Sequence, residues 1–281
     1  MNETLLLIDA HHQIYRAFFA LPPMSGPNGE PVNAIYGFMR MLRKWLNDYG
    51  PTHCAAVFDL GPSTQRRAAY PYYKTKRPPI PADMEAQIPT IREMLDAMHL
   101  PIVERHGEEA DDLIASLAFQ FAQRDARVLI VSNDKDFAQL IGPQIRWVRS
   151  DRHGATTLDA AGVTERFGVP PTQIVDFLCL IGDTADDIPG VPGVGEKTGK
   201  ALIQQFGNIE NLLANSVNIT RQKLLASVFA SAEQLMINRF LIELRTDLML
   251  DISMNDLKLT QPDYQRLTAL FEHCGLRSPY G

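Results

Sequence analysis

Residues 4–9 read TLLLID, a short apolar run that ends on an aspartate, and this pattern recurs along the chain. CAAVFD at 54–59 ends in the same way, and RVLIVS at 127–132 is followed directly by NDKD. Unbroken apolar runs of this length are typical of strands that a parallel sheet buries on both faces. We expect strands at 4–9, 53–59, 101–104 and 127–133, with helices at 33–49, 83–98 and 109–123 between them. This alternation predicts an α/β fold, a mainly parallel sheet flanked by helices.

The second half of the chain has a different pattern. Residues 145–158 predict a further strand or a hairpin, with its turn near His153 and Gly154. From about residue 160 onward the sequence predicts helices, at 159–167, 171–182, 195–206, 208–214, 219–244 and, after an extended stretch at 248–259, 261–273. We therefore expect an α/β domain at 1–160, a helical domain at 161–255 and a helical extension at 256–281.

The composition suits a protein that folds around a sizeable core. The chain has 281 residues, and 45% of them are hydrophobic. No apolar stretch approaches the roughly 20 residues of a membrane span, and the N-terminus lacks the pattern of a signal peptide. The three cysteines, Cys54, Cys179 and Cys274, are widely spaced, which predicts buried thiols in a reducing compartment. We expect a cytoplasmic protein with no membrane contact.

Nine acidic residues lie at the ends of the predicted elements. They are Asp9, Asp59, Glu109, Asp111, Asp112, Asp134, Asp136, Asp183 and Asp186. The carboxyl ends of parallel strands open onto one crevice, where so many like charges need cations to neutralise them. Carboxylates without clustered histidines favour Mg²⁺ or Mn²⁺ over zinc. The sequence therefore predicts a metal-dependent enzyme that acts on phosphate.

Helix capping is the competing explanation for several of these acids. Three of them fall in the first turn of GEEADDLIASLAFQFA, where acids complement the helix dipole, and SNDKDFAQL fits a turn with an N-cap. Three acids in one turn exceed what capping needs, and Asp9 and Asp59 end buried strands, where an unpaired charge is costly. His11 and His12 have no second His or Cys at ligand spacing, so we interpret them as substrate-facing or surface residues.

The net charge of −6 and the isoelectric point near 5.6 argue at first against a nucleic-acid partner. The nine acids account for −9 of that total, which leaves +3 for the rest of the chain. If cations neutralise the acids, the remaining surface is mildly basic. The charge therefore does not exclude DNA or RNA.

Residues 180–200, LIGDTADDIPGVPGVGEKTGK, form the most specific stretch in the chain. Asp183 and Asp186 lie three residues apart, so both can point toward one ion. The glycine-rich turn at 190–195 opens a helix, and such a turn lets the backbone and free amides approach a phosphate. Lys197 and Lys200 add positive charge. The arrangement is that of a helix–hairpin–helix, a sequence-independent clamp on a DNA backbone, and an ordinary loop with glycine caps is the alternative.

Residues 63–82, STQRRAAYPYYKTKRPPIPA, carry five basic residues and no acid, with three tyrosines among them. Basic groups with aromatic platforms suit a single nucleic-acid strand, which offers phosphates and unstacked bases together. A solvated basic loop is the alternative, and the sequence alone leaves the two open.

These motifs together resemble the 5′→3′ exonuclease domain of bacterial DNA polymerase I and its free-standing flap-endonuclease relatives. The resemblance runs from about residue 4 to about residue 255. The matching motifs are LLIDAHHQIYRAFFALPP, GEPVNAIYGFMRML, AAVFD, YYKTKRPPIP, EADDLIASLA, NDKDFAQLI, FGVPPTQIVDFLCLIGD and DIPGVPGVGEKTGKAL. Their order and spacing make the match specific.

The resemblance implies a PIN-like (Rossmann-like) nuclease domain with a basic helical arch at about 63–85, followed by a helix–three-turn–helix domain. It implies two Mg²⁺ ions, for which Mn²⁺ can substitute, and a K⁺ ion at the hairpin. Asp9, Asp59, Glu109, Asp111, Asp112 and Asp134 would surround the first ion, and Asp136, Asp183 and Asp186 would complete the second. Lys74, Arg77, Tyr73 and Arg66 would belong to the arch that receives the 5′ single strand. Gly190, Val191, Gly193, Val194, Gly195, Lys197, Thr198 and Lys200 would grip the duplex.

The implied activity is hydrolysis of DNA phosphodiesters near the 5′ end, by a 5′→3′ exonuclease or structure-specific 5′-flap endonuclease. The substrate would be a flap, nick or gap in replication and repair, with a DNA polymerase and a ligase as functional partners of a monomeric enzyme. The terminal nucleotides would unpair first, and Tyr73 could stack on an unpaired base.

The chain departs from the family pattern at three places. Asp187 stands where asparagine is usual, His11 and His12 replace small residues, and Gln65 replaces a common aromatic. The extra carboxylate of Asp187 is expected to change the second ion's affinity or the shape of the hairpin. Three alternatives remain at this point: a PIN-type ribonuclease, a Mg²⁺-dependent small-molecule phosphatase, and a DNA-junction binder without enzymatic activity.

Overall fold

The computed structural model describes residues 3–61, 63–151 and 154–278. Its six-stranded sheet has the order β3-β2-β1-β4-β5-β6, and only β5 and β6 pair antiparallel. The strands are β1 (Thr4–Asp9), β2 (His53–Val57), β3 (Ile102–Val103), β4 (Arg127–Val131), β5 (Ile145–Asp151) and β6 (Gly154–Leu158). The expected α/β fold with a mainly parallel sheet is confirmed, and 145–158 is a hairpin. Of its expected turn, His153 lies outside the described residues and Gly154 begins β6.

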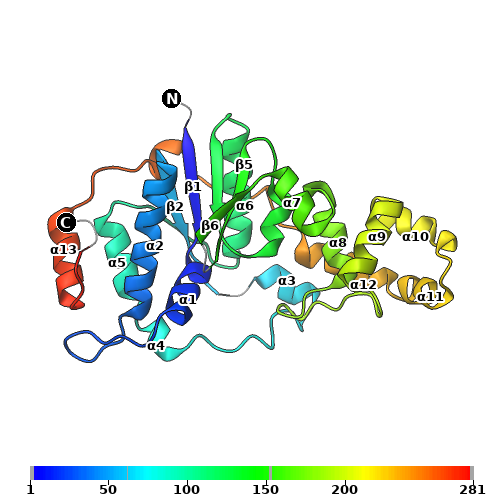
Figure 1. Ribbon diagram of the computed structural model, residues 1–281, viewed down its shortest axis with the longest axis horizontal. Helices are drawn as coiled ribbons and strands as arrows, with labels where there is room; N and C mark the ends of the chain where they lie inside the picture. The colour runs from blue at the N-terminus through cyan, green and yellow to red at the C-terminus, as the bar shows by residue number, and fades with distance from the viewer. Residues whose placement is uncertain (1–2, 62, 152–153, 279–281) are drawn as a thin grey trace.

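Alternate residues of β1 contribute to cores on opposite faces of the sheet. Leu6 and Ile8 pack with helices α1 (Ala10–Ala20), α2 (Asn33–Tyr49), α5 (Ile88–Ala97) and α13 (Tyr264–His273). Leu5 and Leu7 pack instead with α6 (Ala110–Ala122). In Figure 1, α2 and α5 lie to the left of β1 and α6 to its right. Burial on both faces explains why the strands are continuous apolar runs.

The strand order reverses at β1. The chain moves outward from β1 through β2 to β3 on one side, whereas β4 and then β5 lie on the other side. Parallel α/β sheets bind ligands outside the carboxyl ends of the strands at such a reversal point. Asp9 is the last residue of β1, so the fold places this aspartate at that point.

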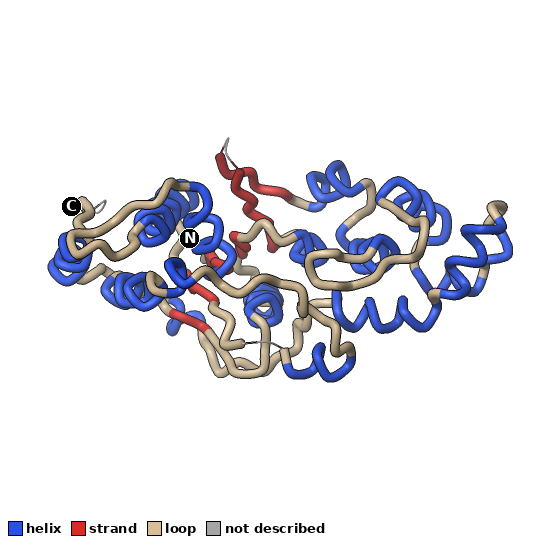
Figure 2. The backbone as a smooth tube through the Cα atoms, turned by 90° about the horizontal axis from the view of Figure 1, so that it is seen from below, coloured by secondary structure: helices blue, strands red, loops and turns tan. Residues whose placement is uncertain are grey.

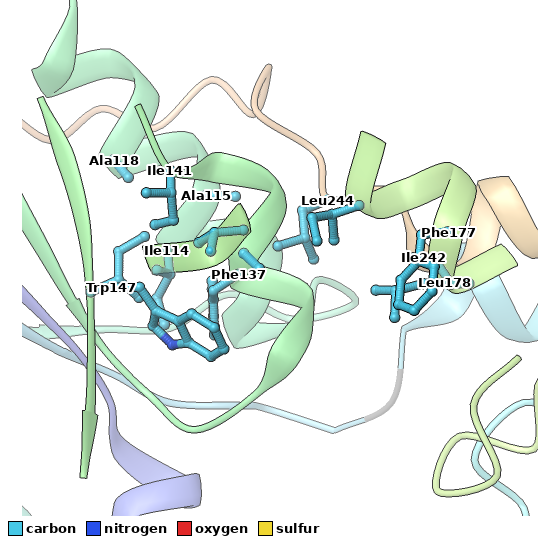
Figure 3. Packing of buried hydrophobic residues seen from close by; sticks show 14 of the residues in the cluster. Ile114, Ala115, Ala118, Phe137, Ile141, Trp147, Phe177, Leu178, Ile242 and Leu244 are labelled. Carbon is cyan, nitrogen blue, oxygen red and sulfur yellow. The ribbon is translucent and has the colours of Figure 1, made fainter. Parts of the chain in front are cut away.

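The segment from α7 to α12 is helical, extends to one side of the sheet (Figures 1 and 2) and forms the helical half. Its elements are α7 (Ala160–Phe167), η2 (Pro171–Gln173), α8 (Ile174–Ile181), α9 (Glu196–Phe206), α10 (Ile209–Ala214), η3 (Ser216–Asn218), α11 (Gln222–Ala230) and α12 (Ala232–Ile242). The chain then returns to the sheet, where η4 (Met254–Leu257) lies beside β2. One hydrophobic core continues from Trp147 and Phe137 beside the sheet to Leu244 and Phe177 in the helical half (Figure 3). The two halves therefore share a core.

Several helices differ from the expected ones. The helix expected at 83–98 is two helices, α4 (Ala82–Glu85) and α5, because Pro89 lies in the first turn of a new helix. The helix expected at 219–244 is interrupted at Ser231, between α11 and α12. Helix α1 was not expected, and α3 (Thr64–Ala69) lies within the expected helical arch. The N-cap of α3 is the side chain of Ser63, which accepts a hydrogen bond from the Arg66 amide.

No helix in the described ranges is both long enough and apolar enough to cross a membrane.

Candidate active site

Four aspartates meet where the carboxyl ends of the central strands open. Asp9 ends β1, Asp59 and Asp134 follow β2 and β4, and Asp111 lies in the first turn of α6. Burial raises the pKa of Asp111 well above its usual range, and the neighbouring charges of Asp134, Asp9 and Asp59 raise it further. The structure thus brings these four acids, far apart in the sequence, into one group of interacting charges.

Local hydrogen bonds fix the orientation of this group. The carboxylate of Asp9 accepts from the His12 amide at 3.2 Å and from the Ser132 hydroxyl at 2.8 Å. Asp59 accepts from the amide of Ala110 at 2.7 Å, at the start of α6. Asp134 likewise caps the 3₁₀ helix η1 (Lys135–Leu140). Helix capping and site formation are therefore not exclusive, because the same carboxylates begin helices and line the crevice.

A second group of acids lies beside the first. Burial raises the pKa of Asp136 well above its usual range, with further contributions from Asp134, Asp186 and Asp183. One buried oxygen of Asp136, Oδ1, has no hydrogen-bond partner among the described residues. An unpaired buried carboxylate oxygen next to three other acids fits a bound cation, which would restore the ionised state of the group.

Basic side chains neutralise the outer acids of the crevice. Lys74 Nζ lies 2.9 Å from Glu109 Oε1 and 3.8 Å from Asp186 Oδ2. Arg77 hydrogen-bonds to Asp186, and Lys135 Nζ lies 3.2 Å from Asp183 Oδ2. Within the part of the chain that the structure describes, no three His, Cys, Asp or Glu side chains are arranged so that they could hold a metal ion as they stand. A cation entering this crevice would therefore have to displace some of these ion pairs.

Lys74 is held at the crevice by its charge partners. Its side chain is 14% exposed. Burial lowers the pKa of Lys74, but Glu109, Tyr73 and Asp186 outweigh this effect and keep the pKa well above its usual range. Lys74 therefore remains a cation, which is the form that can stabilise a phosphate.

Asp112, expected as a ligand of the first ion, has protein partners on both of its oxygens. Arg66 donates to both oxygens of Asp112, and the amide of Arg245 donates to Oδ1 as well. The Asp112 side chain is 2% exposed. In the structure Asp112 is therefore paired with Arg66.

Two residues expected in the arch that receives a single strand have buried side chains in the structure. Arg66 is 4% exposed and directs its guanidinium at Glu109, Asp112 and backbone carbonyls of Leu241 and Glu243. Tyr73 is 3% exposed, and its hydroxyl donates to Glu109 at 3.2 Å. Neither side chain presents a surface for a base. Both orient Glu109 instead.

The glycine-rich turn lies between α8 and α9, as expected, but its residues have different roles. Val191 and Val194 are buried in the core, so their side chains do not face a partner. A Cβ atom on Gly190 would lie 2.4 Å from the backbone of Ile181, which makes Gly190 a packing residue. Gly193 and Gly195 face open space, and Gly195 precedes α9 without a side-chain cap.

The charged end of α9 is accessible beside this turn. Lys197 and Lys200 are exposed and Thr198 is half-buried. Lys197 and Thr198 also line a groove of about 470 Å³ that continues to Thr220 and Arg221 before α11. The accessible part of the turn thus consists of backbone at Gly193 and Gly195 and the first residues of α9.

Two matches with known protein families cover residues 4–265. Residues 4–168 match a 5′-3′ exonuclease N-terminal resolvase-like domain, and residues 169–265 match a 5′-3′ exonuclease C-terminal SAM fold. The chain belongs to the 5′-3′ exonuclease family. The nuclease class expected from the sequence is thereby confirmed, and a small-molecule phosphatase or a binder without activity no longer fits.

Curated members of the family match nearly the whole chain. A 5′-3′ exonuclease of Aquifex aeolicus is 38% identical over 276 residues, 98% of this chain and 93% of that relative. DNA polymerase I of Bacillus caldotenax is 38% identical over 281 residues, 99% of this chain, and the chain spans 32% of that polymerase.

Solved structures of low sequence identity confirm the fold. T5 5′-exonuclease with bound zinc superposes with a TM-score of 0.71 at 22% identity and covers 97% of this chain and 100% of its own. The catalytic core of Rad2 in complex with DNA substrate has a TM-score of 0.65 at 18% identity, covering 97% of this chain and 88% of that one.

In this member of the family, one residue that supports the site was misjudged from the sequence. His11, expected to face substrate or solvent, is half-buried, and its Nδ1 accepts a hydrogen bond from the amide of Asp59 at 3.1 Å. Its ring packs edge-on against Phe58. His11 therefore orients Asp59, and no local sequence signal indicates a contact between residues 48 positions apart.

The extra carboxylate of Asp187 does not face the second group of acids. It accepts a hydrogen bond from the amide of Lys76 at 2.9 Å, which lowers the pKa of Asp187. In the structure this carboxylate therefore contacts the basic segment.

Proposed function

We propose that this nuclease hydrolyses DNA phosphodiesters near the 5′ end of a strand, as a 5′→3′ exonuclease and structure-specific flap endonuclease that requires Mg²⁺. The observation that carries the proposal is the convergence of buried and half-buried acids from three strand ends with the cation of Lys74 beside them. A high density of buried carboxylates next to a fixed cation suits a phosphodiester and two divalent metals. The metal-bound and DNA-bound relatives of the same fold support it.

Two ions would be held by the two groups of acids. Asp9, Asp59, Asp111 and Asp134 would hold the first, with Glu109 adjoining, and Asp136, Asp183 and Asp186 the second. Such ions supply Lewis-acid activation of water and neutralisation of charge at the phosphate, and Mn²⁺ can replace Mg²⁺ in oxygen-rich sites of this kind.

The basic residues of the arch would act directly on the substrate. When cations neutralise Asp186 and the acids near Glu109, Lys74 and Arg77 lose part of their attraction to these carboxylates. The side chains of Lys74 and Arg77 can then bind the scissile phosphate and stabilise its developing charge. Tyr72, which is 68% exposed beside Tyr70, takes the stacking role first expected of Tyr73.

The duplex would bind at the turn between α8 and α9, as a helix–hairpin–helix. Open backbone at Gly193 and Gly195 and the cations of Lys197 and Lys200 suit phosphates without regard to base sequence. A K⁺ ion held by carbonyls of this turn would complete the clamp. We further propose a cytoplasmic monomer that acts on flaps, nicks or gaps beside a DNA polymerase and a ligase.

Cleavage of a 5′-labelled DNA flap tests this function. Short 5′ products are expected with Mg²⁺, none with EDTA, and none from Asp134→Asn. Lys74→Met is expected to lower kcat by about 100-fold or more, the effect of losing one cation that stabilises a transition state. Lys44→Met, on the outer face of α2, is the matched control. Cleavage that survives EDTA, or a faster cut of a matched RNA flap than of the DNA flap, contradicts the proposal.

A further inference from the structure

Two short segments from opposite halves of the chain dock on one another next to the acids. The amide of Lys74 donates to the carbonyl of Asp186 at 3.1 Å. The amide of Lys76 donates to Asp187 Oδ2 at 2.9 Å, and the hydroxyl of Thr75 lies 3.5 Å from the same oxygen. A run of consecutive arch residues is thus hydrogen-bonded to a single dipeptide of the loop.

The loop that carries this dipeptide is a fixed platform. Asp183 and Ile188 exchange two backbone hydrogen bonds, at 2.8 and 2.9 Å, and so close the loop at its base. Behind it, a Cβ atom on Gly182 would lie 2.3 Å from the amide of Gly190, so the two backbones are in direct contact. A side chain on this loop can therefore hold a more mobile partner in place.

Both docked segments contain a residue in the left-handed region of the backbone. Lys74 has φ 56° and Asp187 has φ 58°. This conformation is rare for residues other than glycine and persists where surrounding contacts hold it. In Lys74 it accompanies the placement of the side chain against Glu109. Loss of the docking contacts would let the segment relax to a commoner conformation and move the Lys74 cation.

We propose that Asp187 is a positioning residue, which holds the arch segment 74–77 against the loop so that Lys74 and Arg77 already face the acids before DNA binds. The inference rests on the proposed role of these two cations in cleavage. Asp187 itself touches neither the acid groups nor the reacting atoms in this arrangement. Its effect reaches the site through the backbone of its neighbours.

The hydrogen bond from the Lys76 amide to Asp187 stabilises the docked segment more than the ion pair between the Lys76 and Asp187 side chains does. Asp187 Oδ1 lies 3.0 Å from Lys76 Nζ, but the Lys76 side chain is 86% exposed, whereas that of Asp187 is 5% exposed. Exposed ion pairs contribute little, because water screens them. Asparagine at this position can still accept from the amide and tolerates the left-handed conformation. The substitutions Asp187→Ala, Asp187→Asn and Lys76→Met therefore separate the two contacts.

Limited trypsin digestion without DNA or divalent ions measures the docking by itself. The Lys74–Thr75 bond is present in all three variants, and its cleavage reports how often the segment leaves the loop. Asp187→Ala is expected to speed this cleavage about fivefold, the effect of one lost hydrogen bond, while Asp187→Asn and Lys76→Met stay within about twofold. Thr184→Ala, an exposed residue of the same loop, is the matched control. Circular dichroism and thermal unfolding verify that each variant is folded.

Flap cleavage by the same variants then shows whether the docking matters for catalysis. In Asp187→Ala, DNA has to order the segment on binding, so KM is expected to rise about fivefold with kcat changed less than about twofold, and Asp187→Asn is expected to restore KM. If trypsin cleaves Asp187→Ala at the same rate as Thr184→Ala, and both variants cleave flaps with the same KM, the inference is overturned while the proposed function stands. If the wild-type chain cleaves no flap, the proposed function fails and this inference fails with it.

Discussion

Arg66 donates to both carboxylate oxygens of Asp112, at 2.5 Å to Oδ2 and 2.8 Å to Oδ1. The same guanidinium donates to Glu109 and to the carbonyls of Leu241 and Glu243, so all five of its N–H groups have acceptors. Arg66 begins the arch, Asp112 lies in α6, and Leu241 lies in α12. One buried side chain therefore joins the arch, the α/β half and the helical half directly behind the acids.

Loss of this junction is expected to destabilise the whole chain. Arg66→Met leaves the buried carboxylate of Asp112 without its cation and Glu109 with Lys74 alone, and breaking a buried pair in this way costs about 3–5 kcal/mol. Urea denaturation measures the change. Arg67→Met, on the exposed side of the same short helix, should change the free energy of unfolding by less than about 0.5 kcal/mol. Equal midpoints for both variants would show that the Arg66 contacts do not stabilise the fold.

Metal affinity separates the two adjacent aspartates of α6. Asp111 belongs to the interacting acids, whereas Asp112 is held by Arg66. Asp111→Asn is expected to weaken Mn²⁺ binding at least about 10-fold in calorimetric titration. Asp112→Asn is expected to lower stability and to leave Mn²⁺ affinity within about threefold. If Asp112→Asn weakens Mn²⁺ binding at least about 10-fold and Asp111→Asn does not, Asp112 is a ligand of the first ion and Asp111 is not.

The stability of the metal-free chain is expected to fall as the pH rises through the range in which Asp9 ionises. Burial raises the pKa of Asp9 from 3.8 to about 6, and Asp59 and Asp134 add to this effect. The folded state then binds more protons than the unfolded state between these values, so ionisation costs about 2–3 kcal/mol of stability, all of it lost above pH 6.

Unfolding in EDTA at a series of pH values tests this dependence. Asp9→Asn should flatten the profile between pH 4 and 6 and raise the stability at pH 7. The control Asp247→Asn changes a side chain that is 79% exposed and should leave the profile unaltered. Two results contradict the assignment. One is a wild-type stability that rises between pH 4 and 6, and the other is the same change in stability over this range in Asp9→Asn and Asp247→Asn.

The two glycines that bound the turn before α9 are expected to respond differently to alanine. Gly190→Ala would place a methyl group against the backbone of Ile181, which is expected to cost about 3 kcal/mol or to prevent folding. Gly195→Ala meets open space at an ordinary φ of −101° and should cost less than about 1 kcal/mol. Thermal unfolding compares them. Similar losses in both variants would mean that Gly195 is also packed.

The position of the acidic residues relative to the strands could be predicted from the sequence. Their contacts with distant segments of the chain could not. An apolar run that ends in Asp9 fixes this carboxylate at the edge of the sheet, because parallel strands share one direction. The pairing of Asp112 with Arg66 joins residues 46 positions apart, and no local pattern separates a capping acid from a ligand or from an ion-pair partner. The same holds for the support of Asp59 by His11.

The sequence also did not predict which residues of the glycine-rich turn are buried. The glycine-rich turn was predicted at the right place, because glycine and proline favour turns and interrupt helices. Which of its residues are accessible depends on the packing of α8 and α9, and this packing buries Val191 and Val194 while it exposes Gly193. A motif therefore indicates where a phosphate can bind, and tertiary packing decides which atoms can reach it.

The proposed reaction requires that two groups of acids hold two divalent ions. A crystal of the protein soaked in Mn²⁺, measured at the manganese absorption edge, tests it most directly. We expect two anomalous peaks, one among Asp9, Asp59, Asp111 and Asp134, and one at Asp136, Asp183 and Asp186, with Asp112 still bound to Arg66. Full Mn²⁺ occupancy elsewhere, with neither group of acids bound to an ion, would contradict the account.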